Sequence, residues 1–165
     1  MRLVGAAENL IPFNYGAMTL DSNGDGVVDG FTRNELNATS VFALHDGQEI
    51  TLANVINANG LSGLYLTNLF AVSPNIIHIF SVDAALVRSG AEAIVFYVSW
   101  YTAADVSISS NSSPEINPGA IYSRQSLTGT SPATAAKARI YARVFAKAIG
   151  ATGVVKFKDA LFQAV

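Results

Sequence analysis

Residues 137–146 read KARIYARVFA, and this stretch decides the fold class. Its ten residues are rich in alanine, and a helix is conceivable on propensity alone. A period of two, however, separates large or charged side chains cleanly from small or β-branched ones, whereas a helical period mixes Arg139 and Arg143 with Ile140. The stretch therefore predicts a β-strand with one buried and one polar face.

Further stretches of strand character surround this one, separated by turns. The clearest are residues 40–45 (SVFALH) and 49–52 (EITL), which flank an Asp46-Gly47 signal typical of a β-hairpin. Residues 57–63 and the serine-rich residues 107–119 are predicted as loops. Eight to ten strands without a convincing long helix predict an all-β, antiparallel two-sheet sandwich, and residues 1–165 are most simply one domain. The other predicted strands are residues 9–14, 31–33, 64–72, 76–87, 93–102, 120–128 and 154–162.

An acidic loop, DSNGDGVVDG at residues 21–30, carries three of the chain's twelve acidic side chains. Carboxylates turned toward one point repel each other by about 3 kcal/mol at 5 Å with an effective dielectric near 20, and a cation removes that cost. The pattern D-x-N-x-D-G-x-x-D matches the first nine positions of an EF-hand calcium loop, although Thr32 replaces the glutamate of the twelfth position. The alternative is a surface turn whose Asp, Asn and Gly serve conformation alone. We expect one structural Ca²⁺, held by Asp21, Asn23, Asp25, Asp29 and the Val27 carbonyl, with Glu8 or Asp159 as further ligands.

Composition limits the function classes. The chain has no cysteine, so disulfides and thiol chemistry are excluded. A formal net charge of −2 gives no basic footprint, and nucleic acid is not expected as a partner. No apolar stretch has the length of a membrane span, and residues 1–10 lack the apolar run of a Sec signal, so membrane insertion is not expected. Only 13% of the residues are charged, which suits an extracellular or virion location.

Catalytic motifs are missing from the sequence. It contains no G-x-S-x-G turn, P-loop or zinc-ligand spacing, and its carboxylates are scattered over different predicted elements. His45 and His78 stand alone in strands and are interpreted as structural or exposed rather than as metal ligands. Trp100 alternates with Phe96 and Val98 and is expected in the core. We do not expect an enzyme.

The order of these parts resembles a known family, the galactose-binding-like, jelly-roll carbohydrate-binding modules appended to bacteriophage tail and bacterial surface proteins. The resemblance covers most of residues 9–163. It rests on an Asn-Leu opening, the segment DSNGDGVVDGF, the strands IHIFSVDAAL and AIVFYVSWYT, the segment SPATAAKARIYARV and the last strand VVKFKDALF. It implies a jelly roll with a structural Ca²⁺ between the N-terminal segment and the last strand, where Asp159 is the matching acid. Family members commonly carry consecutive acids there, and this chain has Lys158-Asp159-Ala160 instead.

A ligand-binding face follows from the strand pattern and the resemblance together. Sugar recognition needs flat aromatic faces surrounded by planar hydrogen-bonding groups. Two predicted strands each project such side chains on one face, and the resemblance places both strands in the concave sheet. The leading hypothesis is a non-catalytic module that binds a cell-surface glycan or polysaccharide on a virion tail or other extracellular assembly. The alternative is a structural virion or appendage protein whose aromatic face contacts other virion subunits or further copies of the chain, as a homo-oligomer. The residues concerned are Tyr97, Tyr101, Arg139, Tyr141 and Arg143.

Overall fold

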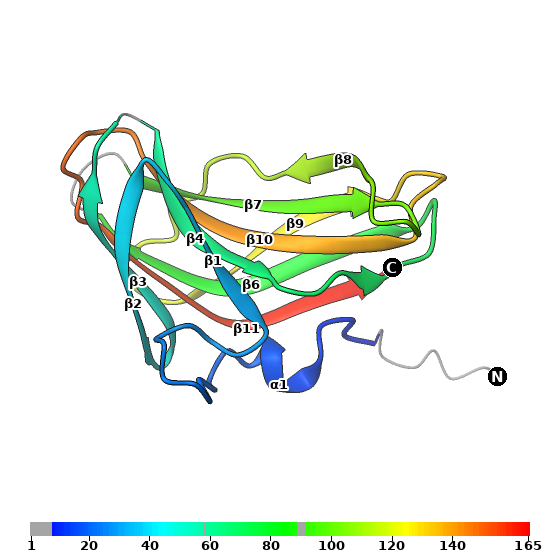
Figure 1. The fold of residues 1–165 in the computed structure, drawn as a ribbon, viewed down its shortest axis with the longest axis horizontal. Coiled ribbons are helices and arrows are strands. Elements are labelled where there is room, and N and C mark those ends of the chain that lie inside the picture. The colour runs from blue at the N-terminus through cyan, green and yellow to red at the C-terminus, as the bar shows by residue number, and fades with distance from the viewer. Residues whose placement is uncertain (1–7, 58, 89–91) are drawn as a thin grey trace.

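The computed structural model of the chain describes residues 8–57, 59–88 and 92–165. These residues form two antiparallel sheets packed face to face (Figure 1). The first sheet has the strand order β1-β4-β10-β7-β8, with β5 also paired to β10, and the second has the order β2-β3-β11-β6-β9. The strands are β1 (Phe31–Leu36), β2 (Ala38–His45), β3 (Gly47–Val55), β4 (Gly60–Leu66), β5 (Phe70–Ala71), β6 (Ile77–Val87), β7 (Glu92–Tyr101), β8 (Ser107–Ser112), β9 (Ser123–Thr130), β10 (Lys137–Ala146) and β11 (Val154–Ala164).

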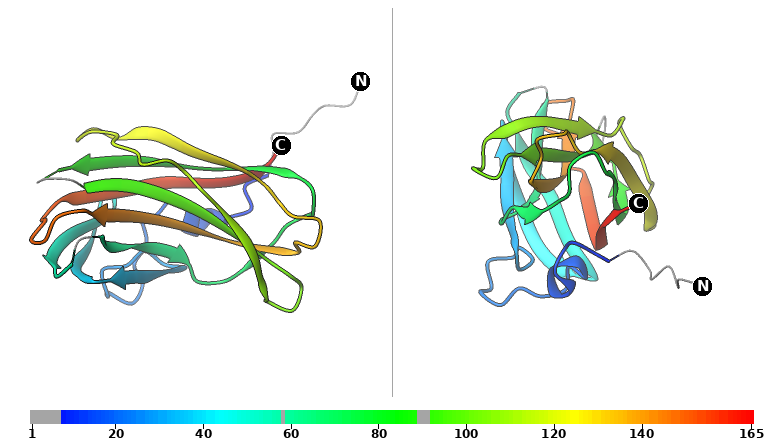
Figure 2. Two further views of the ribbon diagram at one scale, coloured as in Figure 1. Left: turned by 90° about the horizontal axis from the view of Figure 1, so that it is seen from above. Right: turned by 90° about the vertical axis from the view of Figure 1, so that its right-hand side faces the viewer.

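The predicted two-sheet antiparallel sandwich is thus confirmed. Strands β6, β7, β10 and β11 run along the long axis of the molecule, as Figure 2 shows from two further sides. The hairpin around Asp46-Gly47 forms as predicted, with His45 of β2 opposite Gly47 of β3. Among the described residues, no helix is long and apolar enough to cross a membrane.

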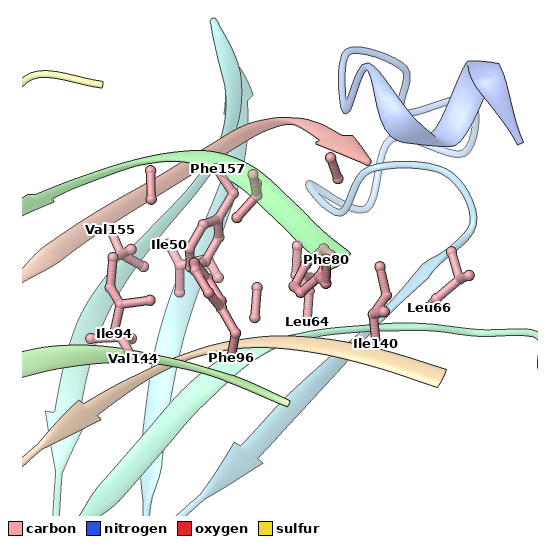
Figure 3. Packing of buried hydrophobic residues seen from close by; sticks show 14 of the residues in the cluster. Ile50, Leu64, Leu66, Phe80, Ile94, Phe96, Ile140, Val144, Val155 and Phe157 are labelled. Carbon is pink, nitrogen blue, oxygen red and sulfur yellow. The ribbon is translucent and has the colours of Figure 1, made fainter. Parts of the chain in front are cut away.

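The core lies between the two sheets, because every second side chain of the long strands points inward. Along β10 buried and partly exposed residues alternate without exception, which confirms the period of two. Phe80, Phe96 and Phe157 come from both sheets and meet in the middle (Figure 3). The rings of Phe80 and Phe96 pack edge to face with centroids 5.4 Å apart. Burial of such side chains stabilises the fold by about 1.5–3 kcal/mol each.

Trp100 and His78 belong to this core. Trp100 is buried as predicted, and its Nε1 donates a hydrogen bond to Asn111 Oδ1 at 2.7 Å. The ring of His78 stacks on Phe162 with centroids 5.1 Å apart and lies 5.4 Å from the Trp100 ring. Burial lowers the pKa of His78, and a hydrogen bond with the Ile76 carbonyl acts in the opposite direction. His78 is therefore a structural side chain.

The predicted first strand, residues 9–14, is wrong. One bond ties the segment to β11, from Leu10 N–H to the Phe162 carbonyl at 2.7 Å. The chain then turns into a short helix, α1 (Phe13–Gly16), whose Tyr15 and Gly16 N–H groups donate to the Pro12 carbonyl. Proline has no N–H for a strand ladder, but its fixed φ suits the start of a helix.

Two predicted loops contain strands. Residues 60–63 open β4, where Gly60 and Gly63 bring the backbone close to its neighbours, and β4 ends at Leu66. Residues 107–112 form β8, which pairs with β7 at the sheet edge. Serine-rich composition suggests turns, but a strand ladder is made by backbone groups and tolerates these polar side chains on an edge.

Candidate functional site

The outer surface of the first sheet gathers all five predicted ligand-binding residues. Odd-numbered residues of β10 point outward, since the even-numbered ones fill the core. Strand register then places Tyr141 directly opposite Tyr97 of β7 on one side and Tyr65 of β4 on the other. Three tyrosines therefore form a row across the middle of the sheet. We call the outward surface made by the following six side chains the tyrosine–arginine face: Tyr65, Tyr97, Tyr101, Arg139, Tyr141 and Arg143.

These side chains stack on one another in an unbroken series. The Arg143 guanidinium lies 4.7 Å from the Tyr97 ring centroid and 4.4 Å from that of Tyr141. The Tyr141 and Tyr65 rings have centroids 5.5 Å apart. Arg139 continues the series, 5.1 Å from the Tyr65 centroid and 5.9 Å from that of Tyr101. Cation–π contacts of this kind contribute about 0.5–1 kcal/mol each at exposed sites and fix the side chains in place.

Neither arginine of the face has a carboxylate partner among the described residues. Arg139 donates from Nη2 to the Thr67 carbonyl at 3.0 Å, but the Nε atoms of Arg139 and Arg143 are buried without a hydrogen-bond partner. Burial lowers the pKa of Arg143, while Tyr97 and Tyr141 act in the opposite direction. The face therefore carries two positive charges that the protein itself does not neutralise.

The hydroxyls of Tyr101 and Tyr141 lie 3.4 Å apart. Burial, and then this hydrogen bond, raise the pKa of Tyr101 above its usual value. Phenolic hydroxyls both donate and accept hydrogen bonds. Together with the guanidinium N–H groups they suit a ligand rich in hydroxyls.

A hollow of about 270 Å³ continues the face beyond Tyr97. Val95 and Phe145 make its apolar part, and an ion pair between Lys147 and Glu115, 2.6 Å long, makes its polar part. One end of the surface thus offers apolar area and the centre offers aromatic rings and cations.

Sequence reasoning missed Tyr65. It occurs in the tripeptide Leu64-Tyr65-Leu66, whose leucines are buried, so a period of two inside the predicted strand 64–72 already marks it as outward. Its place beside Tyr141 depends on the pairing of β4 with β10, which local sequence does not specify. Sequence reasoning also missed Asn34 of β1, whose Oδ1 is buried without a hydrogen-bond partner. Asn34 and Arg143 lie on either side of Gly63 in the strand register.

The acidic loop folds around its own side chains. Asp21 Oδ1 accepts hydrogen bonds from the N–H groups of Gly24 and Asp25 at 2.8 and 3.2 Å, and Asp21 Oδ2 accepts one from Gly26 at 2.9 Å. Asp25 Oδ1 accepts from Val27 N–H at 2.8 Å. Gly26 has a φ of 82°, and a Cβ there would collide with the Phe42 carbonyl, so only glycine fits.

The loop is anchored to the β2–β3 hairpin by Gln48, a buried polar residue that sequence reasoning missed. Gln48 Oε1 accepts from Val28 N–H at 2.8 Å, and Gln48 Nε2 donates to the Gly26 carbonyl at 2.9 Å. Its amide gives no periodic signal in the sequence, because its role is set by a loop that packs from twenty residues away.

The predicted metal ligands are only partly gathered. Asp21, Asn23 and Asp25 share one turn, with Asn23 Nδ2 3.0 Å from Asp25 Oδ2, whereas Asp29 accepts from Ser22 N–H at 2.9 Å. Asp159 lies on a bulge of β11, where its carbonyl accepts from Arg124. Glu8 is exposed at the start of the described chain. Across residues 8–57, 59–88 and 92–165, no three Asp, Glu, His or Cys side chains are close enough to hold a metal ion.

Comparison with known proteins finds similarity in structure only. No family model and no curated protein matches the sequence. The enzymatically active domain of bacteriophage CBA120 tailspike protein 4 aligns over 95% of this chain and 21% of its own, with a TM-score of 0.63 at 11% identity. A CBM4 module aligns over 93% of this chain and 100% of its own, with a TM-score of 0.60 at 12% identity.

A third match is the CBM22-1 xylan-binding domain from Paenibacillus barcinonensis. It aligns over 97% of this chain and 96% of its own, with a TM-score of 0.57 at 12% identity. The chain therefore spans about a fifth of the tailspike domain but nearly the whole of each carbohydrate-binding module. These matches confirm that the sandwich is the jelly-roll fold of carbohydrate-binding modules, as the order of sequence motifs predicts.

Proposed function

We propose that the chain is a non-catalytic glycan-binding module that holds a cell-surface polysaccharide on the tyrosine–arginine face. The observation that carries this proposal is the unbroken stack of four tyrosines and two arginines on an outward sheet surface. The apolar side of a pyranose packs on such rings, and guanidinium and phenol groups bond to its hydroxyls. The fold shared with carbohydrate-binding modules and a phage tailspike domain supports display on a virion tail or another extracellular assembly.

A glycan array tests this function. Wild-type protein is applied in calcium-containing buffer beside Tyr65→Ala, and beside Tyr122→Ala as the matched control. Tyr122 directly precedes β9 of the second sheet, and its ring centroid is 4.3 Å from Lys158 Nζ of β11. We expect wild type and the control to bind the same glycans and Tyr65→Ala to lose them. No binding by folded wild-type protein, or equal binding by all three proteins, would reject the proposal.

The alternative use of the same face is contact with another protein subunit. The tailspike match favours it, and so do exposed apolar side chains beside the face, since Leu36 of β1 is 58% exposed. Sedimentation of the wild type and of Leu36→Ser separates the two uses. A stable oligomer that Leu36→Ser dissociates would support a subunit interface, whereas a monomer that binds glycan supports recognition.

We also propose that the acidic loop binds one structural Ca²⁺ through Asp21, Asn23, Asp25 and the Val27 carbonyl, with Asp29 nearby. A carboxylate has about four acceptor sites, and Asp21 uses three of them on backbone N–H groups while Asp25 accepts two hydrogen bonds. Acceptor sites therefore remain for a hard cation. Asp159 is a further candidate ligand, and it comes from a different element, the bulge of β11.

Melting curves with excess Ca²⁺ and with EDTA test the calcium site. A tight site stabilises by about 2.7 kcal/mol at 100 times its Kd, which corresponds to roughly 5–10 °C. We expect that decrease on chelation, and no response to EDTA in Asp25→Ala. An unchanged melting temperature of the wild type would show that the loop is a turn without a metal.

A further inference from the structure

We propose that the tyrosine–arginine face selects acidic polysaccharides, whose sugars carry carboxylate or sulfate groups. This inference rests on the proposed glycan-binding function and adds the chemical class of the ligand. It follows from the charges, the unpaired polar atoms and the spacing of the face.

The charges on the face have one sign. The outward positions are those whose side chains lie on the same face of the sheet as Tyr141. Across β1, β4, β10, β7 and β8, the described outward positions hold no Asp or Glu. Among the described residues, Asp105 and Glu115 lie near its two ends, and each pairs with a lysine: Asp105 with Lys137 at 2.5 Å and Glu115 with Lys147 at 2.6 Å. The two guanidinium groups in the centre of the face therefore have no anionic partner among the described residues.

Three polar atoms at the face have no hydrogen-bond partner in the described part of the protein, and all three are buried. The Nε atoms of Arg139 and Arg143 lack acceptors, and Asn34 Oδ1 lacks a donor. Carboxylates and sulfates are the acceptors that a guanidinium binds best, because two of their oxygens can accept its two parallel N–H bonds. Sugar hydroxyls supply donors. An acidic sugar chain contains both kinds of group, and a neutral chain supplies no charge to offset the two arginines.

The spacing of the arginines favours a polymer. Arg139 and Arg143 are four residues apart on β10, so their Cα atoms are about 14 Å apart at 3.4 Å per residue. The stacked rings of Tyr65 and Tyr141 lie between their guanidinium groups in the series. A sugar chain laid along β10 crosses the tyrosine pair and passes both arginine side chains.

The net charge of the chain allows binding at this face to be distinguished from nonspecific attraction of a polyanion. The whole chain carries a formal charge of −2, so its overall field does not attract a polyanion. Arg124 provides a matched control cation, because it lies on the second sheet and pairs with Asp83 at 2.9 Å. A polyanion that binds the tyrosine–arginine face depends on Arg139 and Arg143 and not on Arg124.

Affinity electrophoresis in native gels tests this with polymer pairs that share a backbone. The pairs are polygalacturonate and its methyl ester, carboxymethyl cellulose and hydroxyethyl cellulose, and dextran sulfate and dextran. We expect at least one acidic member to retard the wild type with a Kd at least tenfold lower than its neutral partner. Arg139→Gln and Arg143→Gln should each weaken that retardation at least tenfold, while Arg124→Gln leaves it unchanged. Arg143→Lys, which keeps the charge but not the planar fork, should fall between.

Three results would overturn the inference. Equal retardation by the acidic and neutral members of every pair would leave glycan binding intact but remove the preference for acid. Retardation by acidic polymers that persists in both Arg→Gln variants would place the polyanion elsewhere on the molecule. Absence of retardation by all three acidic polymers would reject acid selection, while the glycan array judges the broader function separately. Melting temperatures of the four arginine variants within a few degrees of wild type confirm that each is folded.

Discussion

The two outer surfaces of the sandwich use their cations in opposite ways. On the second sheet, Lys156 of β11 pairs with Glu49 of β3 at 2.9 Å, and Arg124 of β9 pairs with Asp83 of β6 at 2.9 Å. Each pair joins residues that lie directly opposite in neighbouring strands. On the first sheet, Arg139 and Arg143 lie against tyrosine rings and have no carboxylate partner among the described residues.

The ion pairs of the second sheet contribute to stability, whereas the arginines of the first sheet are the groups proposed to bind a ligand. Partly exposed ion pairs stabilise a protein by about 0–1 kcal/mol each, and a cross-strand pair leaves both charges satisfied. The second sheet is thus a closed surface that offers a ligand little. The guanidinium groups of the first sheet gain cation–π contacts from the fold but no counter-ion in the described chain, so their charges stay available for an anionic ligand.

The largest effect should come from Tyr141→Ala, because Tyr141 stacks on both Tyr65 and Arg143 at the centre of the first sheet. Central aromatic side chains commonly contribute 2 kcal/mol or more to binding, so we expect glycan affinity to fall at least about 30-fold. Far-ultraviolet circular dichroism should be unchanged. Calorimetric titration measures the loss, with Tyr122→Ala on the second sheet as control. If both tyrosine variants bind like wild type, the two surfaces do not differ in recognition.

Glu49→Gln should affect stability and not binding. Glu49 contacts Lys156 at 2.9 Å and lies 3.8 Å from His45, so the substitution removes the acceptor charge of a small network. We expect a decrease of about 0.5–1 kcal/mol in the free energy of unfolding, measured by urea denaturation. Glycan affinity should stay at the wild-type value. A loss of affinity in this variant would mean that the second sheet takes part in binding.

Alkaline pH should lower the free energy of unfolding through titrating groups on both surfaces, and more through those on the second sheet. Burial raises the pKa of Tyr101 on the first sheet and of Tyr122 on the second, and Asp46 raises the pKa of Lys158. A raised pKa means that the folded state holds its proton longer than the unfolded state. The stabilisation is therefore complete below the unfolded pKa of about 10 and is lost as pH rises through the folded value.

The variants Tyr122→Phe and Tyr101→Phe check this in urea titrations between pH 8 and 11. Tyr122→Phe removes the titrating phenol and its hydrogen bond to the Asp46 carbonyl, so it should flatten the alkaline decrease in stability more than Tyr101→Phe does. A larger flattening in Tyr101→Phe than in Tyr122→Phe would show that the titrating groups of the first sheet contribute more to the alkaline loss of stability.

The smallest effect should be that of Arg143→Met on stability. Methionine keeps a long side chain between the Tyr97 and Tyr141 rings but removes a desolvated charge. The lost cation–π contacts and the relieved desolvation oppose each other, so we expect a change within about 0.5 kcal/mol by urea denaturation. A large destabilisation would indicate that Arg143 serves the fold rather than a ligand.

Local sequence pattern predicted most of the strands and five of the six residues of the face. The alternation in β10 separates Ala138 and Ile140 in the core from Arg139 and Tyr141 outside, because a strand has only two sides. Tyr65 was missed as a member of the face because β4 and β10 are distant in sequence and their pairing is a tertiary result. Gln48 was missed for a similar reason, since its partners Gly26 and Val28 lie in another loop.

Predictions from composition failed where the backbone alone decides the structure. The serines of β8 look like loop residues, yet they complete the sheet through main-chain bonds to β7. Pro12 ended the predicted first strand and began α1 instead. The metal site stays a prediction, because carboxylates that accept backbone N–H groups in a turn have the same sequence pattern as carboxylates that hold a cation.

An amide NMR titration tests the central claim that the outer surface of the first sheet binds glycan. Isotope-labelled protein in calcium buffer is titrated with a galacturonate hexamer and, separately, with xylohexaose. The claim predicts that chemical-shift changes from at least one of these concentrate in β4, β7 and β10 around Tyr65, Tyr97 and Tyr141, and that they disappear in Tyr141→Ala. Changes confined to β6, β9 and β11, or to the acidic loop, would contradict it, as would unchanged spectra with both hexamers at millimolar concentration.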